Sequence, residues 1–306
     1  MGNVSILGIF VADLAFRAAR QPAMGETIMG SGFKMGPGGK GSNQAVAAAR
    51  AGANVTFISR LGRDAFGEIA LSTWRAEKIR TDRVVLTDQQ PTGAAYIFIE
   101  DQSGENAIIV VPGAAGTIGK ADVDQAAADI RAAKVFITQL EQPIEAALHG
   151  LSIAKQAGVT TIFNPAPAAP LPDAVYALCD YITPNETEAS AITGVQVTGL
   201  DSAKAAADRL LQRGVGCALI TLGEAGALYH TAKESVLVPA FDAGKVVETT
   251  GAGDAFNGGF AAALAAGRNP RDAVRFGCAT AGIAVTRPGT APSMPKLAEI
   301  EALLVR

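Results

Sequence analysis

Residues 248–259 combine a glycine-rich turn with a carboxylate, a pattern suited to phosphate chemistry. Apolar residues recur after the turn at a spacing of four and predict a helix that begins near Ala252. The first N–H groups of a helix have no partner within it, and the helix dipole adds partial positive charge, so an anion is favoured there. Gly251 and Gly253 carry no Cβ atom and allow the backbone to approach such a ligand closely.

Asp254 falls in the first turn of this helix, beside the expected anion site. Phosphoryl transfer requires donors for the migrating group and an acceptor for the proton of the attacking hydroxyl. Asp254 is therefore a candidate general base. The alternative is that Asp254 only caps the helix, a role in which Asp is common.

A second glycine-rich segment, residues 36–43, precedes an alanine-rich helix expected to end near Ala51. Its glycines match G-x-G-x-x-G, but they do not directly follow the first strand as a dinucleotide-binding turn requires. A Walker A loop is excluded because Gly41 stands where Ser or Thr must follow the lysine. Lys40 and Asn43 could hold a small polar ligand at this helix start, or the segment could be a tight turn with an exposed lysine.

Two carboxylates follow expected strands, where open α/β sheets bind their ligands. Asp13 comes after the first apolar run, and the alternative is a solvated loop acid. Glu141 follows another strand and could accept hydrogen bonds from a ligand, although Pro143 suggests that it only leads into a helix.

Residues 183–188 contain two possible capping boxes, Thr183 with Glu186 and Asn185 with Glu188. Helix initiation alone could explain them. The functional alternative is a carboxylate that helps to organise a hydrated Mg²⁺ near a phosphate. Residues 221–226 end a further buried strand and could pass beside a nucleotide, although the pattern by itself indicates only a turn.

The composition excludes several classes of function. The formal net charge of the 306 residues is -3 and no run of Lys or Arg occurs, so neither nucleic acid nor an anionic membrane is an expected partner. Three distant cysteines indicate buried thiols in a reducing compartment. His149 and His230 are the only histidines, which argues against a zinc site or a Ser-His-Asp triad. Residues 2–14 lack the features of a signal peptide and no apolar run approaches a membrane span, so we expect a cytoplasmic protein.

The order of elements predicts a doubly wound, mostly parallel α/β sheet flanked by helices. Residues 4–11 are almost all apolar and predict a strand buried on both faces. Strands are also expected at 55–59, 135–138, 160–164, 181–183 and 217–221, and helices at 64–76, 121–132, 143–156, from 185, 202–213 and 270–286. Residues 14–35 and 92–111 interrupt this alternation and are expected to form a small separate sheet, with a hairpin turn at 101–104.

The chain resembles the ribokinase family of sugar kinases, the phosphofructokinase-B-like group. The resemblance rests on residues 39–43 (GKGSN), Asn185-x-x-Glu188 and Gly251-Ala-Gly-Asp254, in this order and spacing, and it covers essentially the whole chain. It implies a single domain over residues 1–306, with a β-sheet lid formed by about 13–36 and 91–113, and often a homodimer through the lid. It further implies transfer of the ATP γ-phosphoryl group to the primary hydroxyl of a small sugar, with D-ribose the expected substrate.

The resemblance also implies a role for each matching residue. Asp254 would be the base, and the N–H groups of Gly251, Ala252, Gly253 and Asp254 the anion hole. The sugar would be held by Asp13, Gly39, Lys40, Asn43 and Glu141. ATP would be held by Asn185, by Thr221, Gly223 and Gly226, by Gly253, and by the helix near Cys278. Glu188 would act on Mg²⁺ through water. K⁺, the expected activator, would be bound by the side chains of Glu248 and Ser293 and the carbonyls of Thr250, Ala284, Arg287 and Gly289.

Two positions depart from the pattern of the family. Glu248 stands where Asp is usual and keeps the carboxylate on a longer arm. Val11 stands where Asn would face the sugar, and a hydroxyl left unpaired there costs about 1–3 kcal/mol. The substrate could thus be 2-deoxyribose, another pentose or a ketohexose such as fructose. The chain could also be a nucleoside kinase, a non-catalytic sugar-binding protein or, from the 36–41 pattern alone, a nicotinamide-dependent oxidoreductase.

Overall fold

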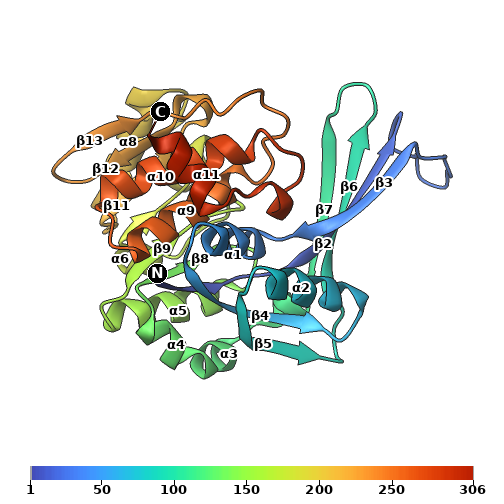
Figure 1. Cartoon of the computed structure of the whole chain (residues 1–306), viewed down its shortest axis with the longest axis horizontal. Helices are drawn as coiled ribbons and strands as arrows, with labels where there is room; N and C mark the ends of the chain where they lie inside the picture. The colour runs from blue at the N-terminus through green and yellow to red at the C-terminus, as the bar shows by residue number, and fades with distance from the viewer. Residues whose placement is uncertain (1, 306) are drawn as a thin grey trace.

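The computed structural model describes residues 2–305 and contains two separate sheets (Figure 1). The larger has nine strands in the order β13-β12-β11-β10-β9-β8-β1-β4-β5. Neighbours from β11 to β5 pair in parallel, and β12 and β13 add an antiparallel edge. The strands are β1 Asn3–Leu7, β4 Asn54–Gly62, β5 Arg80–Thr87, β8 Val135–Thr138, β9 Thr160–Phe163, β10 Tyr181–Ile182, β11 Cys217–Thr221, β12 Ala227–His230 and β13 Ser235–Val238. The predicted parallel α/β sheet is confirmed.

Helices cover both faces of this sheet because side chains alternate across each strand. Val135 and Ile137 of β8 pack into one core and Phe136 into the other. The first core is covered by α1 Lys40–Arg50, α2 Ala65–Ala76, α9 Ala252–Ala265, α10 Pro270–Ala284 and α11 Leu297–Leu304. The second is covered by α3 Lys120–Gln125, α4 Ala127–Ala132, α5 Ile144–Gln156, α6 Ala174–Leu178, α7 Glu186–Thr193 and α8 Leu200–Gln212.

The smaller sheet has four strands in the order β3-β2-β6-β7 and extends to one side of the main body (Figure 1). Its strands are β2 Val11–Ala18, β3 Gly32–Gly38, β6 Thr92–Glu100 and β7 Asn106–Gly113. The predicted hairpin is present, because β6 and β7 pair antiparallel and Gly104 in their turn has φ +73°. We call these four strands the side sheet.

The expectation of one strand over residues 4–11 is wrong. β1 ends at Leu7, and Val11 already begins β2 of the side sheet. Between them the start of α1 approaches closely: a Cβ atom on Gly8 would lie 2.7 Å from the Cα of Gly41, and the Ser42 N–H donates to the Ile9 carbonyl (3.1 Å). The apolar run therefore crosses from one sheet to the other instead of continuing as a strand.

Other boundaries also differ from expectation. The helix expected over 121–132 is divided into α3 and α4 at Ala126, whose N–H donates to the Val123 carbonyl (3.1 Å) in a tightened turn. Strands β5, β12 and β13 and helices α6 and α11 were not predicted. Among residues 2–305, none of the helices has the length and apolar character needed to cross a membrane.

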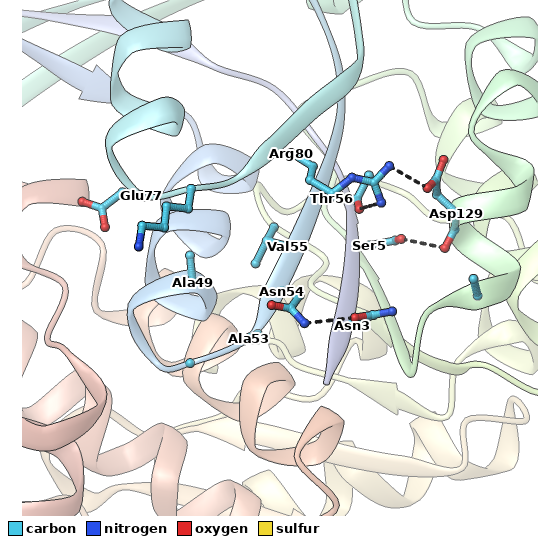
Figure 2. A pocket seen from close by; sticks show the side chains of 13 residues that line it. Asn3, Ser5, Ala49, Ala53, Asn54, Val55, Thr56, Glu77, Arg80 and Asp129 are labelled. Carbon is cyan, nitrogen blue, oxygen red and sulfur yellow. Dashed lines mark hydrogen bonds and ion pairs between the residues drawn. The ribbon is translucent and has the colours of Figure 1, made fainter. Parts of the chain in front are cut away.

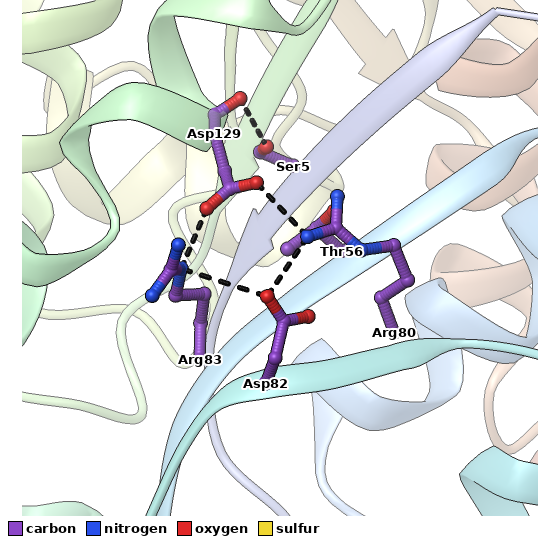
Figure 3. Close-up of polar contacts among 6 residues, drawn as sticks. All are labelled: Ser5, Thr56, Arg80, Asp82, Arg83 and Asp129. Atoms are coloured by element: carbon purple, nitrogen blue, oxygen red, sulfur yellow. Dashed lines mark hydrogen bonds and ion pairs between the residues drawn. The ribbon is translucent and has the colours of Figure 1, made fainter.

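A cluster of ion pairs fastens β5 to α4 (Figure 3). Asp129 of α4 accepts a hydrogen bond from Arg83 (2.6 Å) and contacts Arg80 (3.2 Å), while Asp82 contacts both arginines. Burial acts to raise the pKa of Asp129, but the two guanidinium groups outweigh it and lower that pKa. The cluster holds the edge strand β5, which has no further strand beyond it in the sheet as described over residues 2–305.

Candidate active site

Two helix starts, those of α1 and α9, form the centre of the site. The helices pack at very short distance because Gly258 of α9 faces α1: a Cβ atom there would lie 2.4 Å from the Cβ of Ala47 and 2.6 Å from the carbonyl oxygen of Gln44. This contact brings the first turn of α1 against the first turn of α9. Residues 211 positions apart in the sequence therefore form hydrogen bonds.

Asp254 lies buried in the first turn of α9, with 6 % of its surface exposed. Asn43 Nδ2 donates to its Oδ2 (3.0 Å) and Gln44 Nε2 to its Oδ1 (3.1 Å). Burial raises the pKa of Asp254, while the charge of Lys40 and the two amide donors oppose the rise. Asp254 makes no cap: the cap residue is Gly251, in the left-handed conformation at φ +82°. The geometry therefore suits a proton acceptor rather than a helix cap.

Charged groups from three other elements surround Asp254. Glu141 Oε2 accepts the backbone N–H of Lys40 (2.7 Å) at the start of α1, so Glu141 is drawn to the site. Burial, opposed by Lys40 and assisted by Asp254 and Asp13, raises the pKa of Glu141 to about 7. Burial and the charges of Asp254 and Glu248 raise the pKa of Asp13 to about 6. Burial acts to lower the pKa of Lys40, but Asp254, Glu141 and Glu188 outweigh it and raise that pKa.

The glycine-rich loop before α1 contains a position that requires glycine and, soon after it, a polar atom without a partner. Gly39 has φ +87°, and a Cβ atom there would lie 2.6 Å from the Ile9 carbonyl oxygen, so this position requires glycine. Asn43 is 4 % exposed, and its Oδ1 is buried without a hydrogen-bond partner among residues 2–305. A buried amide oxygen without a partner is costly.

The predicted nucleotide residues come together at the ends of β10 and β11. Asn185 and Glu188 form the predicted capping box: Asn185 N–H donates to Glu188 Oε2 (2.9 Å) and Glu188 N–H to Asn185 Oδ1 (2.8 Å). Asn185 also forms a β-bridge with Thr221, beside Gly223 at φ +52°. Cys278 lies in the core between α9 and α10, where burial raises its pKa to about 12. The Cys278 side chain therefore packs in the core and does not itself point to a nucleotide site.

The two segments predicted to bind K⁺ are joined. The Gly289 N–H donates to Glu248 Oε2 (2.8 Å), and the Val247 N–H donates to the Val285 carbonyl (2.8 Å). Ser293 Oγ donates to the Thr290 carbonyl (2.7 Å), and Thr290 lies against Gly251. Oxygen atoms from both segments therefore gather beside the turn before α9. Among residues 2–305, no group of three His, Cys, Asp or Glu side chains is placed to hold a metal ion.

Sequence reasoning missed a set of buried polar residues behind Asp254. Gln44, Asn164, Thr183 and Asn257 connect to one another and to α9 through hydrogen bonds. The sequence signal for Gln44 was its position directly after Asn43. Both residues lie near the start of the same helix, so both side chains can reach the site. Asn164 and Thr183 each follow an apolar strand, the same signal that identified Glu141.

A separate cleft lies near β1 and β4, away from this site. A cavity of about 410 Å³ opens between the amino ends of these strands and the carboxyl ends of α1 and α2, and its labelled residues include Asn54, Glu77 and Arg80 (Figure 2). The residues that line it share no member with the predicted site residues. The site described above lies at the opposite, carboxyl end of the parallel strands.

Comparison with known proteins agrees with this geometry. Residues 1–297 match the family described as pfkB family carbohydrate kinase. The chain belongs to this family. The kinase is 39 % identical to a ribokinase of Haemophilus influenzae over 293 residues, covering 96 % of this chain and 95 % of the relative. It is 35 % identical over 303 residues to a deoxyribokinase of Salmonella typhi, covering 99 % of this chain and 98 % of the relative.

The fold of the kinase is shared as well. It superposes on the structure of Arabidopsis thaliana ribokinase complexed with ribose and ATP with a TM-score of 0.92, at 30 % identity and covering 99 % of this chain and 98 % of that one. The predicted ribokinase-like fold and carbohydrate kinase family are confirmed. The nicotinamide-dependent alternative receives no support.

Proposed function

We propose that this kinase transfers the γ-phosphoryl group of ATP to the primary hydroxyl of D-ribose. The observation that carries the proposal is Asp254, a buried carboxylate at the start of α9 that accepts a hydrogen bond from Asn43 Nδ2 (3.0 Å) and lies within the influence of the Lys40 charge. A ribokinase complexed with ribose and ATP shares the fold, and ribokinases share the sequence, over nearly the whole chain.

Asp254 receives the proton of the attacking hydroxyl and directs that hydroxyl in line with the γ-phosphorus. Because the transition state is loose, orientation matters more than a strongly basic carboxylate. The N–H groups of Gly251, Gly253 and Asp254 stabilise the charge that develops on the phosphoryl oxygens. The Ala252 N–H, also expected in the anion hole, donates instead to the Thr249 carbonyl (3.1 Å). Asp13, Gly39, Lys40, Asn43 and Glu141 hold the sugar. Asn185, Thr221, Gly223, Gly226, Gly253 and the α10 helix near Cys278 hold ATP.

Two cations belong to the proposal. Glu188 at the start of α7 would hold a hydrated Mg²⁺ through water, and Mg²⁺ would supply positive charge to the nucleotide phosphates. Burial raises the pKa of Glu188, and a cation nearby would favour its ionised form. K⁺ fits beside the turn before α9, where the side chains of Glu248 and Ser293 and the carbonyls of Thr250, Ala284, Arg287 and Gly289 supply oxygen atoms, as hard cations prefer.

The test is ATP consumption, with Mg²⁺ and K⁺ present, across ribose, 2-deoxyribose, other pentoses, fructose and adenosine. We expect the highest kcat/KM with ribose. A preference for adenosine or fructose would overturn the substrate, and no turnover on any of them would favour a non-catalytic sugar-binding protein.

A second candidate substrate is 2-deoxyribose, favoured by Val11. This side chain is buried at the start of β2, where it pairs with Gly38 and Gly93, and it points to the same face as Asp13 two residues later. An apolar group there offers no partner to a sugar hydroxyl. A deoxyribokinase is among the relatives at 35 % identity.

Val11→Asn is therefore expected to raise the preference for ribose over 2-deoxyribose by about 10-fold or more, because the amide pairs a hydroxyl that Val11 leaves unpaired. The measurement is the ratio of kcat/KM for the two sugars. Val11→Leu, which adds no polar group, should leave this ratio near that of the parent. An unchanged ratio in Val11→Asn would place the side chain away from the sugar.

We further propose that residues 13–36 and 91–113 of the side sheet form a lid over the sugar and that two copies associate through it. Its register places Phe16 opposite Phe33 and Leu14 opposite Met35, on the face away from Asp13. Phe33 is 60 % exposed, and Phe16 lies 4.9 Å from it, ring centre to ring centre. Exposed apolar surface of this extent on a sheet is a typical site of association.

Phe33→Glu is expected to convert a dimer to a monomer, because two carboxylates would be buried at the interface. Sedimentation velocity over a range of concentrations measures the change. Leu237→Glu on β13, also an exposed apolar residue, is the control and should keep the parent's oligomeric state. A parent that sediments as a monomer throughout would contradict the dimer.

The three cysteines of the described chain are free and buried, which supports the cytoplasm as the compartment we propose.

A further inference from the structure

A network of buried side-chain amides lies behind Asp254. Gln44 and Gln139 are fully buried, Asn257 is 1 % exposed and Asn164 6 % exposed. Gln44 Nε2 donates to Asp254 Oδ1 (3.1 Å) and to Asn164 Oδ1 (3.1 Å), and Gln44 Oε1 accepts from Gln139 Nε2 (2.6 Å). Every polar atom of the Gln44 side chain therefore has a partner.

The direction of each hydrogen bond in this network is determined by groups that can only accept. The Asp254 carboxylate, when ionised, is one of these, so the Gln44 nitrogen must face it. The Thr183 carbonyl is another: it accepts from Asn164 Nδ2 (2.9 Å), which leaves Asn164 Oδ1 to accept from Gln44. The amide of Gln44 consequently has one orientation, because reversing it would place its oxygen against Asp254 Oδ1 and Asn164 Oδ1 and its nitrogen against Gln139 Nε2.

On its other side, the network is joined to the glycine-rich turn before α9. Thr183 Oγ1 donates to Asn257 Oδ1 (2.7 Å), and Asn257 Nδ2 donates to the Gly253 carbonyl (2.9 Å). Gly253 precedes Asp254 in the chain. The base and the turn beside it are thus held from both directions by the same buried side chains.

We propose that Gln44 is a positioning residue that holds the Asp254 carboxylate toward the sugar hydroxyl and keeps it a proton acceptor. The inference rests on the proposed function, in which Asp254 is the base. Asn43 also bonds to Asp254, but its other atom faces the sugar site, so its contribution changes with the ligand. Gln44 has no such second role because all its bonds are internal.

The charges around Asp254 support this role. Lys40 of α1 is the cation that interacts with the charge of Asp254. Three anions also interact with that charge: Asp13 of β2, Glu141 after β8 and Glu188 of α7. Burial disfavours the ionised form of Asp254 and raises its pKa, whereas Lys40, Asn43 and Gln44 favour the ionised form. Loss of the Gln44 donor should raise the pKa of Asp254, so the acidic limb of the activity profile should move to higher pH.

The test compares Gln44→Met with Gln142→Met, a matched change at another buried glutamine. Gln142 Nε2 donates to Thr138 Oγ1 (2.8 Å) and the Gln139 carbonyl (2.6 Å). Gln44→Met is expected to lower kcat by roughly 10- to 100-fold with little change in KM, and to shift the acidic limb upward. Gln142→Met should keep the parent's kcat and pH profile. Equal effects in the two variants, or no pH shift in Gln44→Met, would overturn the proposal.

Gln44→Glu gives a second readout that preserves the shape of the side chain. When protonated, the carboxyl introduced at position 44 can donate to Asp254, whereas its ionised form repels Asp254, so the two carboxyls share one proton. Activity relative to the parent should therefore fall as pH rises through the pKa of this shared proton. A relative activity that does not change with pH would contradict the positioning role. If the parent phosphorylated none of the sugars tested, the proposed function itself would fail, which is a different outcome from an active parent with unaffected Gln44 variants.

Discussion

Asp254→Asn is expected to lower kcat for ribose phosphorylation by about 10³-fold, the middle of the range for loss of a general base. The amide has nearly the size of the carboxylate, but it cannot accept the proton and would direct an N–H toward Asn43 or Gln44, which are donors. Steady-state kinetics with ribose and ATP measure the loss. Calorimetric titration should show that ribose still binds, because other side chains supply most of its contacts.

The control for Asp254→Asn is Asp129→Asn, a change of the same type in the ion-pair cluster of α4. It should affect stability and leave kcat near that of the parent. An Asp254→Asn enzyme with parental kcat would show that the base has been misassigned, even if the fold and family stand.

Gly258→Val is expected to have the second largest effect, although Gly258 touches neither sugar nor nucleotide in our account. A Cβ atom at this position would lie 2.4 Å from Ala47 and 2.9 Å from the backbone nitrogen of Ala48, distances that atoms do not adopt without movement of α1. Overpacking of this kind costs about 3 kcal/mol of unfolding free energy, and more where backbone must shift. Moving α1 also carries Asn43 and Gln44 away from Asp254, so kcat should fall by roughly 10- to 100-fold.

Denaturant unfolding and steady-state kinetics test both parts of this prediction. Gly199→Val is the matched control, because its surroundings are open and its φ of 171° suits any residue. Gly199 is the N-cap residue of α8, where Val is less favourable than Gly, so the control should cost about 1 kcal/mol of unfolding free energy at most and leave kcat near that of the parent. If Gly258→Val were as stable and as active as the control, the close contact of α1 with α9 would not be what assembles the site.

Much of the fold follows from local patterns in the sequence. The alternation of apolar strands with helices predicted the parallel sheet, and the starts of α2 and α7 were predicted because Asp64 and Asn185 accept hydrogen bonds from the first turn of each helix. Gly52, at φ +94°, ends α1 as expected. These features depend on contacts within a few residues, which a single sequence displays.

The errors concern features that depend on distant contacts. The apolar run over residues 4–11 gave no sign of its break after Leu7, because the break is caused by the approach of Gly41 from α1. β5 alternates weakly and begins with charged residues, of which Arg80 and Arg83 are paired with Asp129 of α4. Neither partner can be inferred from the strand itself.

Part of the candidate site could also be predicted from the sequence. Asp254, Lys40, Asn43 and Glu141 stood out because each is a chemically active residue at a helix start or strand end, and the structure brings them together. Gln44 did not stand out, since an amide in an alanine-rich helix gives no signal until its partners Gln139 and Asn164 are placed beside it. The variants described above test the proposed roles of these residues.

The most direct test of our central claim is the position of the phosphate on the product. We would incubate the kinase with ATP, Mg²⁺, K⁺ and ribose and examine the product by ³¹P NMR, with 5-deoxyribose as the matched sugar that lacks the primary hydroxyl. We expect a single phosphomonoester on the primary carbon of ribose and no product from 5-deoxyribose. Phosphorylation of 5-deoxyribose, or a ribose product carrying phosphate at another carbon, would contradict the claim.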